Sequence, residues 1–225
     1  MDFYRMLSAA YDEIFPYSPD TASMVKSFAP HGGNILDVGS ATGQYVKRYL
    51  RCGYSAFGLE YVPGLVHFHE YTAVGDMTSL PFQPVFDVIA CTGNTLAHCK
   101  NYTHAESILG GFHDTLKPGG AAVIQILNYY KILMHKPSQL PEIKTKHYIF
   151  KRHYEYVKNH ITFKGTLKNG RDTKTSSVTL YPLTPREVLD GALAAGFSYI
   201  EFFGDFKGKG FDIEEDFMLV AVLKK

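Results

Sequence analysis

The stretch Ile35-Leu36-Asp37-Val38-Gly39-Ser40-Ala41-Thr42-Gly43 places a short, mostly apolar run directly before a glycine-rich turn. This pattern predicts a buried strand over residues 34–38 and a turn that leads into a helix. Glycine in such a turn tolerates positive φ and lets a ligand approach the backbone closely. We therefore expect a ligand site at the carboxyl end of this strand.

The spacing of the two glycines distinguishes this turn from a dinucleotide site. Gly39 and Gly43 are spaced G-x-x-x-G, whereas a pyrophosphate-binding turn has G-x-G-x-x-G. Asp37 would repel a pyrophosphate, but it would attract an ammonium or sulfonium group. An NAD-dependent dehydrogenase stays an alternative, because such enzymes also carry an acidic residue at the end of the second strand; the spacing and Asp37 weigh against it.

Further strands are predicted outward from this turn, over residues 56–60, 73–75, 86–91 and 121–127. Between the last two, apolar residues recur at helical spacing until Lys117-Pro118-Gly119-Gly120 ends the helix. Alternating strands and helices favour an α/β fold with parallel strands. We predict a Rossmann-like, mostly parallel seven-stranded sheet with helices on both faces.

The pattern changes after the fifth strand to an alternation of aromatic and polar residues. Asn169-Gly170 is a strong hairpin signal, so residues 129–181 are predicted to form an antiparallel insertion over the active site. Thr184-Pro185-Arg186-Glu187 then begins a capped helix, and strands over 199–203 and 217–223 complete the sheet. Residues 1–225 are expected to form one domain.

Acidic residues follow the second and third strands. Glu60 ends the second strand, where a carboxylate can bind a ribose diol; the alternative is a solvated acid at a strand end. Asp76 and Met77 follow the third strand and would place a hydrogen-bond acceptor and an apolar contact beside an adenine. Asp76 alone could equally be a turn residue.

Five stretches, in this order, resemble the successive signatures of the class I S-adenosylmethionine-dependent methyltransferases. They are Leu36-Asp37-Val38-Gly39-Ser40-Ala41-Thr42-Gly43, Gly58-Leu59-Glu60, Gly75-Asp76-Met77, Phe86-Asp87-Val88-Ile89 and Leu116-Lys117-Pro118-Gly119-Gly120. The resemblance spans nearly the whole chain. It implies S-adenosylmethionine as cofactor, S-adenosylhomocysteine as product, and methyl transfer to a small-molecule acceptor by in-line displacement. A non-catalytic S-adenosylmethionine-binding module remains an alternative, because fold and binding do not prove catalysis.

The resemblance also assigns expected cofactor contacts. The turn from Gly39 to Gly43 would contact the amino-acid part, Glu60 the ribose, and Asp76 with Met77 the adenine. Tyr4 and residues 11–15 resemble the family's helical lid, which would bring tyrosines over the sulfonium. Simple helix packing is the alternative. The expected cofactor-binding residues are Tyr11, Asp37, Gly39, Ser40, Ala41, Gly43, Glu60, Tyr61, Asp76, Met77, Thr92 and Asn94.

A closer resemblance concerns the acceptor side. Residues 91–98 contain a G-N-x-x-x-H pattern that is similar to the glycine and sarcosine N-methyltransferase group, which implies an amine acceptor. On this basis His98, Asn128 and Tyr181 are the candidate catalytic or acceptor-binding residues. One position departs from the group, because Ser177 stands where relatives carry a carboxylate-binding arginine. Lys174 or Arg171 could substitute, although solvated hairpin charges are the simpler interpretation.

Composition limits the partners. The formal net charge is only +1, so no nucleic-acid partner is expected, and no apolar run is long enough for a membrane span. A cytoplasmic location is the resulting expectation, and a homodimer is possible. His67, His69 and Glu70 alternate on a predicted short helix and would point in different directions, so no metal site is expected.

Overall fold

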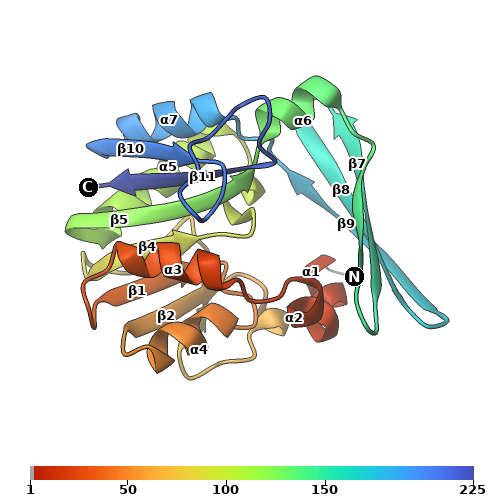
Figure 1. The fold of residues 1–225 in the computed structure, drawn as a ribbon, viewed down its shortest axis with the longest axis horizontal. Coiled ribbons are helices and arrows are strands. Elements are labelled where there is room, and N and C mark those ends of the chain that lie inside the picture. The colour runs from red at the N-terminus through yellow and green to blue at the C-terminus, as the bar shows by residue number, and fades with distance from the viewer. Residues whose placement is uncertain (1–2) are drawn as a thin grey trace.

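The computed structural model describes residues 3–225; residues 1 and 2, which belong to the predicted single domain, lie outside the described residues. It contains a seven-stranded sheet of order β10-β11-β5-β4-β1-β2-β3 and a four-stranded sheet of order β6-β7-β8-β9 (Figure 1). The strands of the large sheet are β1 (Asn34–Val38), β2 (Ser55–Glu60), β3 (Thr72–Val74), β4 (Phe86–Cys91), β5 (Leu116–Leu127), β10 (Tyr199–Phe203) and β11 (Met218–Lys224).

The large sheet is parallel from β1 to β5, and β11 is antiparallel to both β5 and β10. This confirms the predicted α/β class and its mostly parallel sheet. Most predicted strand bounds are shifted by no more than one residue, but β5 begins at Leu116 instead of residue 121. The reason is that Leu116 already pairs with Phe86. The register of the two strands then shifts, so that residues 117–120 lie between this pair and the next one, Val88 with Ala121.

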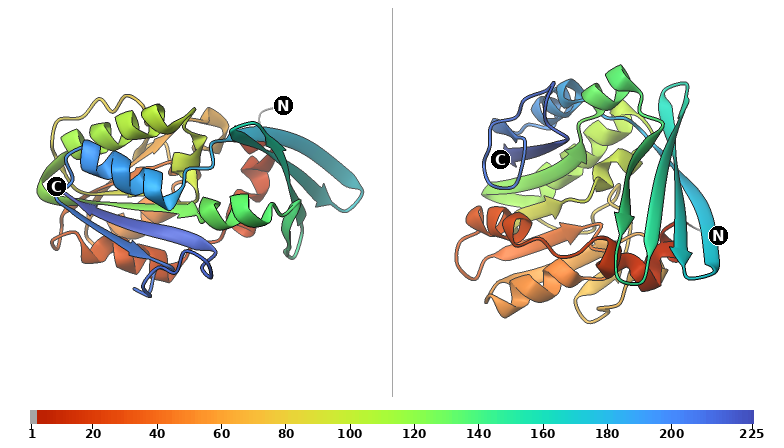
Figure 2. Two further views of the ribbon diagram at one scale, coloured as in Figure 1. Left: turned by 90° about the horizontal axis from the view of Figure 1, so that it is seen from above. Right: turned by 45° about the vertical axis from the view of Figure 1, so that its right-hand side comes forward.

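Helices cover both faces of the large sheet, as Figure 2 shows from above. On one face lie α3 (Pro19–Ser27) and α4 (Gln44–Arg51); on the other lie α5 (Tyr102–Thr115) and α7 (Pro185–Ala194). Successive side chains of a strand point to opposite faces of the sheet and so contribute to a core on each face. Ile35 packs with α3 and α4, while Leu36 packs with α5 and α7. The predicted capping box at Thr184 and Glu187 is present at the start of α7.

The insertion after β5 is antiparallel, as predicted, but it begins with a helix that the sequence pattern did not indicate. This helix is α6 (Tyr129–His135), and its strands are β6 (Gln139–Lys144), β7 (Ile149–Val157), β8 (His160–Asn169) and β9 (Asp172–Leu180). The β8–β9 hairpin turns at Asn169-Gly170, where Gly170 has a φ of 57°. These four strands pair only with one another, so the small sheet stands beside the large one rather than extending it (Figure 1).

The N-terminal segment forms α1 (Phe3–Leu7), a 3-10 turn η1 (Ser8–Ala10) and α2 (Tyr11–Ile14), which lie between the two sheets in Figures 1 and 2. The ring of Phe3 lies 5.3 Å from that of Phe163 and 6.4 Å from that of Phe150. Two further 3-10 turns, η2 (Pro63–Leu65) and η3 (Thr95–His98), follow β2 and β4. No helix among residues 3–225 combines the length and apolarity needed to cross a membrane.

A pair of glycine substitutions tests how closely the N-terminal segment packs on the small sheet. A Cβ at Gly165 in β8 would lie 2.7 Å from the rings of both Phe3 and Phe150, whereas a Cβ at Gly110 in α5 meets no atom within 4 Å. We expect Gly165→Ala to lower the free energy of unfolding by about 1–3 kcal/mol through overpacking. Gly110→Ala should raise it by about 0.5–1 kcal/mol. Urea denaturation measures the free energy of unfolding of both variants. Equal changes in the two variants would contradict the close packing of Phe3 and Phe150 on Gly165.

Candidate active site

Two adjoining cavities lie at the carboxyl ends of β1, β2 and β4. One has a volume of about 410 Å³ and the other of about 320 Å³, and both are lined by Tyr4, Tyr11, Gly39 and Gly93. We call them the large and the small cavity. Their shared lining makes them neighbours, and their size is that of small-molecule and cofactor sites.

The turn after β1 approaches the loop after β4 closely. Gly39 has a φ of 74°, and a Cβ there would lie 2.5 Å from Cγ2 of Thr95. Gly43 has a φ of 76° and precedes α4. Both glycines are therefore required by the backbone, and at Gly39 the close approach is to Thr95 as well as to the cavities.

Glu60 holds the turn and faces the large cavity. The residue is 6% exposed, and its two carboxylate oxygens accept hydrogen bonds from the backbone N–H groups of Ala41 at 2.9 Å and Val62 at 2.8 Å. Each oxygen of an ionised carboxylate has capacity for further hydrogen bonds. Glu60 can thus fix the loops after β1 and β2 and still bind a hydroxyl in the cavity.

Asp37 is a buried carboxyl group in the small cavity. It is 4% exposed, and its Oδ2 atom has no hydrogen-bond partner among the described residues. Burial, together with the nearby charge of Glu60, raises the pKa of Asp37 to about 7. Ser40, which lines the same cavity, also has a buried hydroxyl without a partner. Buried polar groups of this kind are costly unless a ligand satisfies them.

The residues expected beside the adenine line the large cavity. Asp76 is exposed and accepts a hydrogen bond from the backbone of Thr78 at 2.9 Å, so its turn role and a ligand role are compatible. Met77 is half-buried at the same wall. Tyr61 is 69% exposed, which places it at the rim of the cavity.

Two N-terminal tyrosines, Tyr4 and Tyr11, contribute to the walls of both cavities. Tyr11 lines both, and burial together with the charges of Glu60 and Asp37 raises the pKa of its hydroxyl. The Tyr4 hydroxyl forms a 2.6 Å hydrogen bond with Nε2 of His98. Burial lowers the pKa of His98 to about 4, so its imidazole is neutral at pH 7 and is a weak base.

The loop after β4 carries Thr92 and Asn94, which both line the small cavity. Asn94 has a φ of 67°, donates to the hydroxyl of Tyr129 at 2.8 Å, and accepts from the backbone N–H of Leu127 at 3.0 Å. Its side chain therefore ties this loop to the end of β5 and to α6. Any ligand contact of Asn94 would be made by a rigidly held group.

Asn128 and Tyr181 do not line either cavity. Asn128 is buried at the start of α6, where its amide donates to the backbone oxygens of Ile213 and Asp216 and its Oδ1 accepts from Lys131. The hydroxyl of Tyr181 donates to Glu187 at 2.5 Å. The structure therefore gives both side chains bonds that connect secondary structure elements.

The walls of the small cavity include residues that the sequence analysis missed. The insertion contributes Leu140, Arg152, Tyr154, Phe163 and Leu180. By contrast, Ser177, Lys174 and Arg171 are exposed and lie outside both linings, so neither basic residue takes the place of the missing arginine there.

The histidines considered as metal ligands lie in an irregular segment after η2 rather than on the predicted short helix, so that prediction is wrong. The chain forms only a single 3-10 turn over Pro63–Leu65, and Val66 then adopts an extended conformation. His67 forms a 3.2 Å hydrogen bond with Ser8. Within residues 3–225 no three potential ligands are grouped as a metal site requires.

Comparison with known proteins places this geometry in context. Residues 36–124 match the family model described as "Methyltransferase domain". No curated protein matches the sequence. Similar solved structures include an S-adenosylmethionine-dependent methyltransferase from Clostridium acetobutylicum, at 11% identity and a TM-score of 0.82 over 99% of both chains. The CcbJ methyltransferase from Streptomyces caelestis shares 19% identity, with a TM-score of 0.81 over 96% of this chain and 95% of that chain.

A third similar structure was solved with the cofactor bound. It is CalS10, an amino pentose methyltransferase from Micromonospora echinaspora, at 17% identity and a TM-score of 0.68 over 99% of this chain and 98% of that chain. At these identities the likeness is one of fold. The chain thus carries a methyltransferase domain match over residues 36–124 and has, over nearly its whole length, the fold of the S-adenosylmethionine-dependent methyltransferases.

Proposed function

We propose that the protein is an S-adenosylmethionine-dependent methyltransferase that methylates a small-molecule amine. The observation that carries this proposal is the placement of Asp37 and Glu60 at the ends of neighbouring strands, each facing one of two adjoining cavities. A carboxylate binds a cation through an ion pair, and a carboxylate at the end of the neighbouring strand can bind a ribose diol. The pair therefore suits a ligand that carries both groups.

The side chains fit this cofactor. The unpartnered Oδ2 of Asp37 would accept from its amino group, and Ser40 would donate to its carboxylate. Glu60 would hold the ribose, while Asp76, Met77 and Tyr61 would enclose the adenine. Gly39, Ala41, Gly43, Thr92 and Asn94 would shape the backbone around the amino-acid part. When bound, S-adenosylmethionine supplies an electrophilic methyl group on a sulfonium.

The chain's own contribution to catalysis is orientation and exclusion of water. Tyr4 and Tyr11 sit where the two cavities meet, so they would cover the reacting centre and offer their ring faces to positive charge. An acceptor in the small cavity would approach in line from the side of the insertion. Neutral His98 would hold the Tyr4 hydroxyl in place, and the amine would lose its proton to solvent before binding, because an imidazole with a pKa of about 4 is a weak base.

This assignment gives different roles to the three candidate catalytic residues. His98 lines the large cavity and would act on the acceptor by holding the Tyr4 hydroxyl. Asn128 and Tyr181 would act as positioning residues, through α6 and α7 respectively. The amine acceptor is favoured by the likeness to an amino pentose methyltransferase. Membership of the glycine and sarcosine group, a cytoplasmic location, a single domain and a homodimer stay proposals.

Isothermal titration with S-adenosylmethionine, S-adenosylhomocysteine and NAD tests the cofactor. We expect both adenosyl sulfur compounds to bind and, in a parallel thermal unfolding experiment, to raise the melting temperature of the protein. NAD should do neither. Binding of NAD alone would replace the proposal with a dehydrogenase. Binding of S-adenosylmethionine without turnover on any amine, phenol or carboxylic acid would favour the non-catalytic binding module.

A further inference from the structure

Arg152 is a cation in the wall of the small cavity. It lies on β7 directly opposite Gly165 of β8, and it shares the cavity with Tyr154, Phe163 and the carboxyl group of Asp37. Arg152 is half-buried, and the buried Tyr154 follows it on the same face of β7. Burial lowers the pKa of Arg152.

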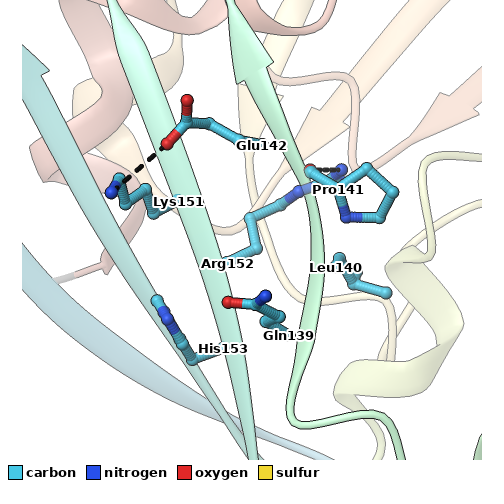
Figure 3. Close-up of a pocket in the computed structure, with 7 residues that line it drawn as sticks. All are labelled: Gln139, Leu140, Pro141, Glu142, Lys151, Arg152 and His153. Carbon is cyan, nitrogen blue, oxygen red and sulfur yellow. Dashed lines mark hydrogen bonds and ion pairs between the residues drawn. The ribbon is translucent and has the colours of Figure 1, made fainter.

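The hydrogen bonds of Arg152 are incomplete. Its Nη2 atom donates to the backbone oxygen of Pro141 at 2.7 Å, as Figure 3 shows, but its buried Nε atom has no partner among residues 3–225. None of the ion pairs formed by residues 3–225 includes Arg152. A buried N–H of a charged group without an acceptor costs more than a lost neutral hydrogen bond.

The fold holds this guanidinium at a break in the small sheet. The β6–β7 register shifts between Leu140 and Ile143, which frees the carbonyl group of Pro141 from the strand ladder. The side chain of Arg152 lies at this break, in the pocket that Figure 3 shows. Arg152 also lines the small cavity. A planar guanidinium anchored on one side presents its remaining N–H groups in the geometry that a carboxylate accepts.

We propose that Arg152 binds a carboxylate carried by the methyl acceptor. This inference rests on the proposed function, because it assigns the acceptor to the small cavity. The part of the wall that the insertion contributes beside Arg152, with Leu140, Tyr154 and Phe163, would favour an acceptor with an apolar body. The cofactor's own carboxylate is the competing occupant; we favour the acceptor because the residues expected to hold the cofactor follow strands of the large sheet, whereas Arg152 belongs to the insertion.

Titration with matched ligands tests the proposal. The probes are 3-phenylpropionate and benzoate, each compared with its neutral primary amide, added to the protein with and without saturating S-adenosylhomocysteine. We expect the carboxylates to bind roughly tenfold to a hundredfold more tightly than the amides. Arg152→Met, which keeps the length of the side chain, should abolish this preference, and Arg152→Lys should retain part of it.

The control variant is Arg186→Met, which removes an exposed arginine on α7 and should keep the full preference. Two results would overturn the inference: wild-type protein that binds acids and amides alike, or Arg152→Met that loses affinity for S-adenosylhomocysteine but keeps the preference for acids. If the preference is present while S-adenosylhomocysteine fails to bind wild-type protein, the proposed function fails and the carboxylate site stands.

Discussion

Glu60→Ala is expected to weaken both the fold and cofactor binding, more than any other single change in the site. The two carboxylate oxygens accept from the backbone of Ala41 and Val62, so truncation leaves two buried N–H groups without acceptors. At about 1–3 kcal/mol for each unsatisfied group, the free energy of unfolding should fall by roughly 2–6 kcal/mol. Loss of the ribose hydrogen bonds should raise the Kd of S-adenosylhomocysteine on the order of a hundredfold.

Urea denaturation and isothermal titration at low temperature measure the two effects separately. Glu60→Gln keeps one oxygen and should lose less stability than Glu60→Ala, while its affinity for the cofactor should still fall. Glu214→Ala removes an exposed carboxylate and serves as the control. A Glu60→Ala protein of wild-type stability would refute the described hydrogen bonds, and wild-type affinity would refute the ribose assignment.

The sequence predicted the large sheet well because its signals are local. Short apolar runs and capping residues specify the strands and helices from within each segment, and a parallel sheet then brings the ends of β1 and β2 together. The amino-acid pattern alone was therefore enough to place Asp37 and Glu60 at one edge of the sheet. The start of β5 was missed because Pro118 and two glycines indicate a turn, whereas pairing of Leu116 with Phe86 extends the strand.

The acceptor side was less predictable because its contacts come from segments far apart in the chain. Asn128 was chosen by motif position, yet its amide bonds to residues 85 and 88 positions away, which no local pattern reveals. Arg152 did leave a signal. It shares one face of β7 with Phe150, Tyr154 and Tyr156 by the two-residue period of a strand, and a lone cation on an aromatic face marks a position worth testing.

Asp37→Asn should have the opposite combination of effects, with cofactor binding lost and stability at neutral pH retained or raised. The pKa of Asp37 is raised to about 7 in the folded protein from an ordinary value of 3.8. Between these values the folded state holds a proton that the unfolded state has released. Wild-type stability should therefore fall as pH rises from about 4 to 7, by up to about 4 kcal/mol, and should stay level above 7.

Asparagine at position 37 does not titrate, so this fall should be absent from the variant. Other groups, such as His98, titrate in both proteins, and the difference between the two stability curves measured by urea denaturation from pH 4 to 8 isolates Asp37. The exposed Asp172→Asn is the control and should follow the wild-type curve. Parallel curves for wild type and Asp37→Asn would show that Asp37 ionises normally.

The same carboxyl group links cofactor binding to pH. Only ionised Asp37 can pair with the cofactor's amino group, so binding to wild-type protein should release a proton below pH 7. The affinity for S-adenosylhomocysteine should then rise with pH up to about 7, approaching tenfold per pH unit at the acid end, and level off above it. Asp37→Asn should bind weakly at every pH. If the affinity of wild-type protein for S-adenosylhomocysteine does not change from pH 5 to 8, the amino group of the ligand does not pair with Asp37, because such pairing requires Asp37 to lose its proton.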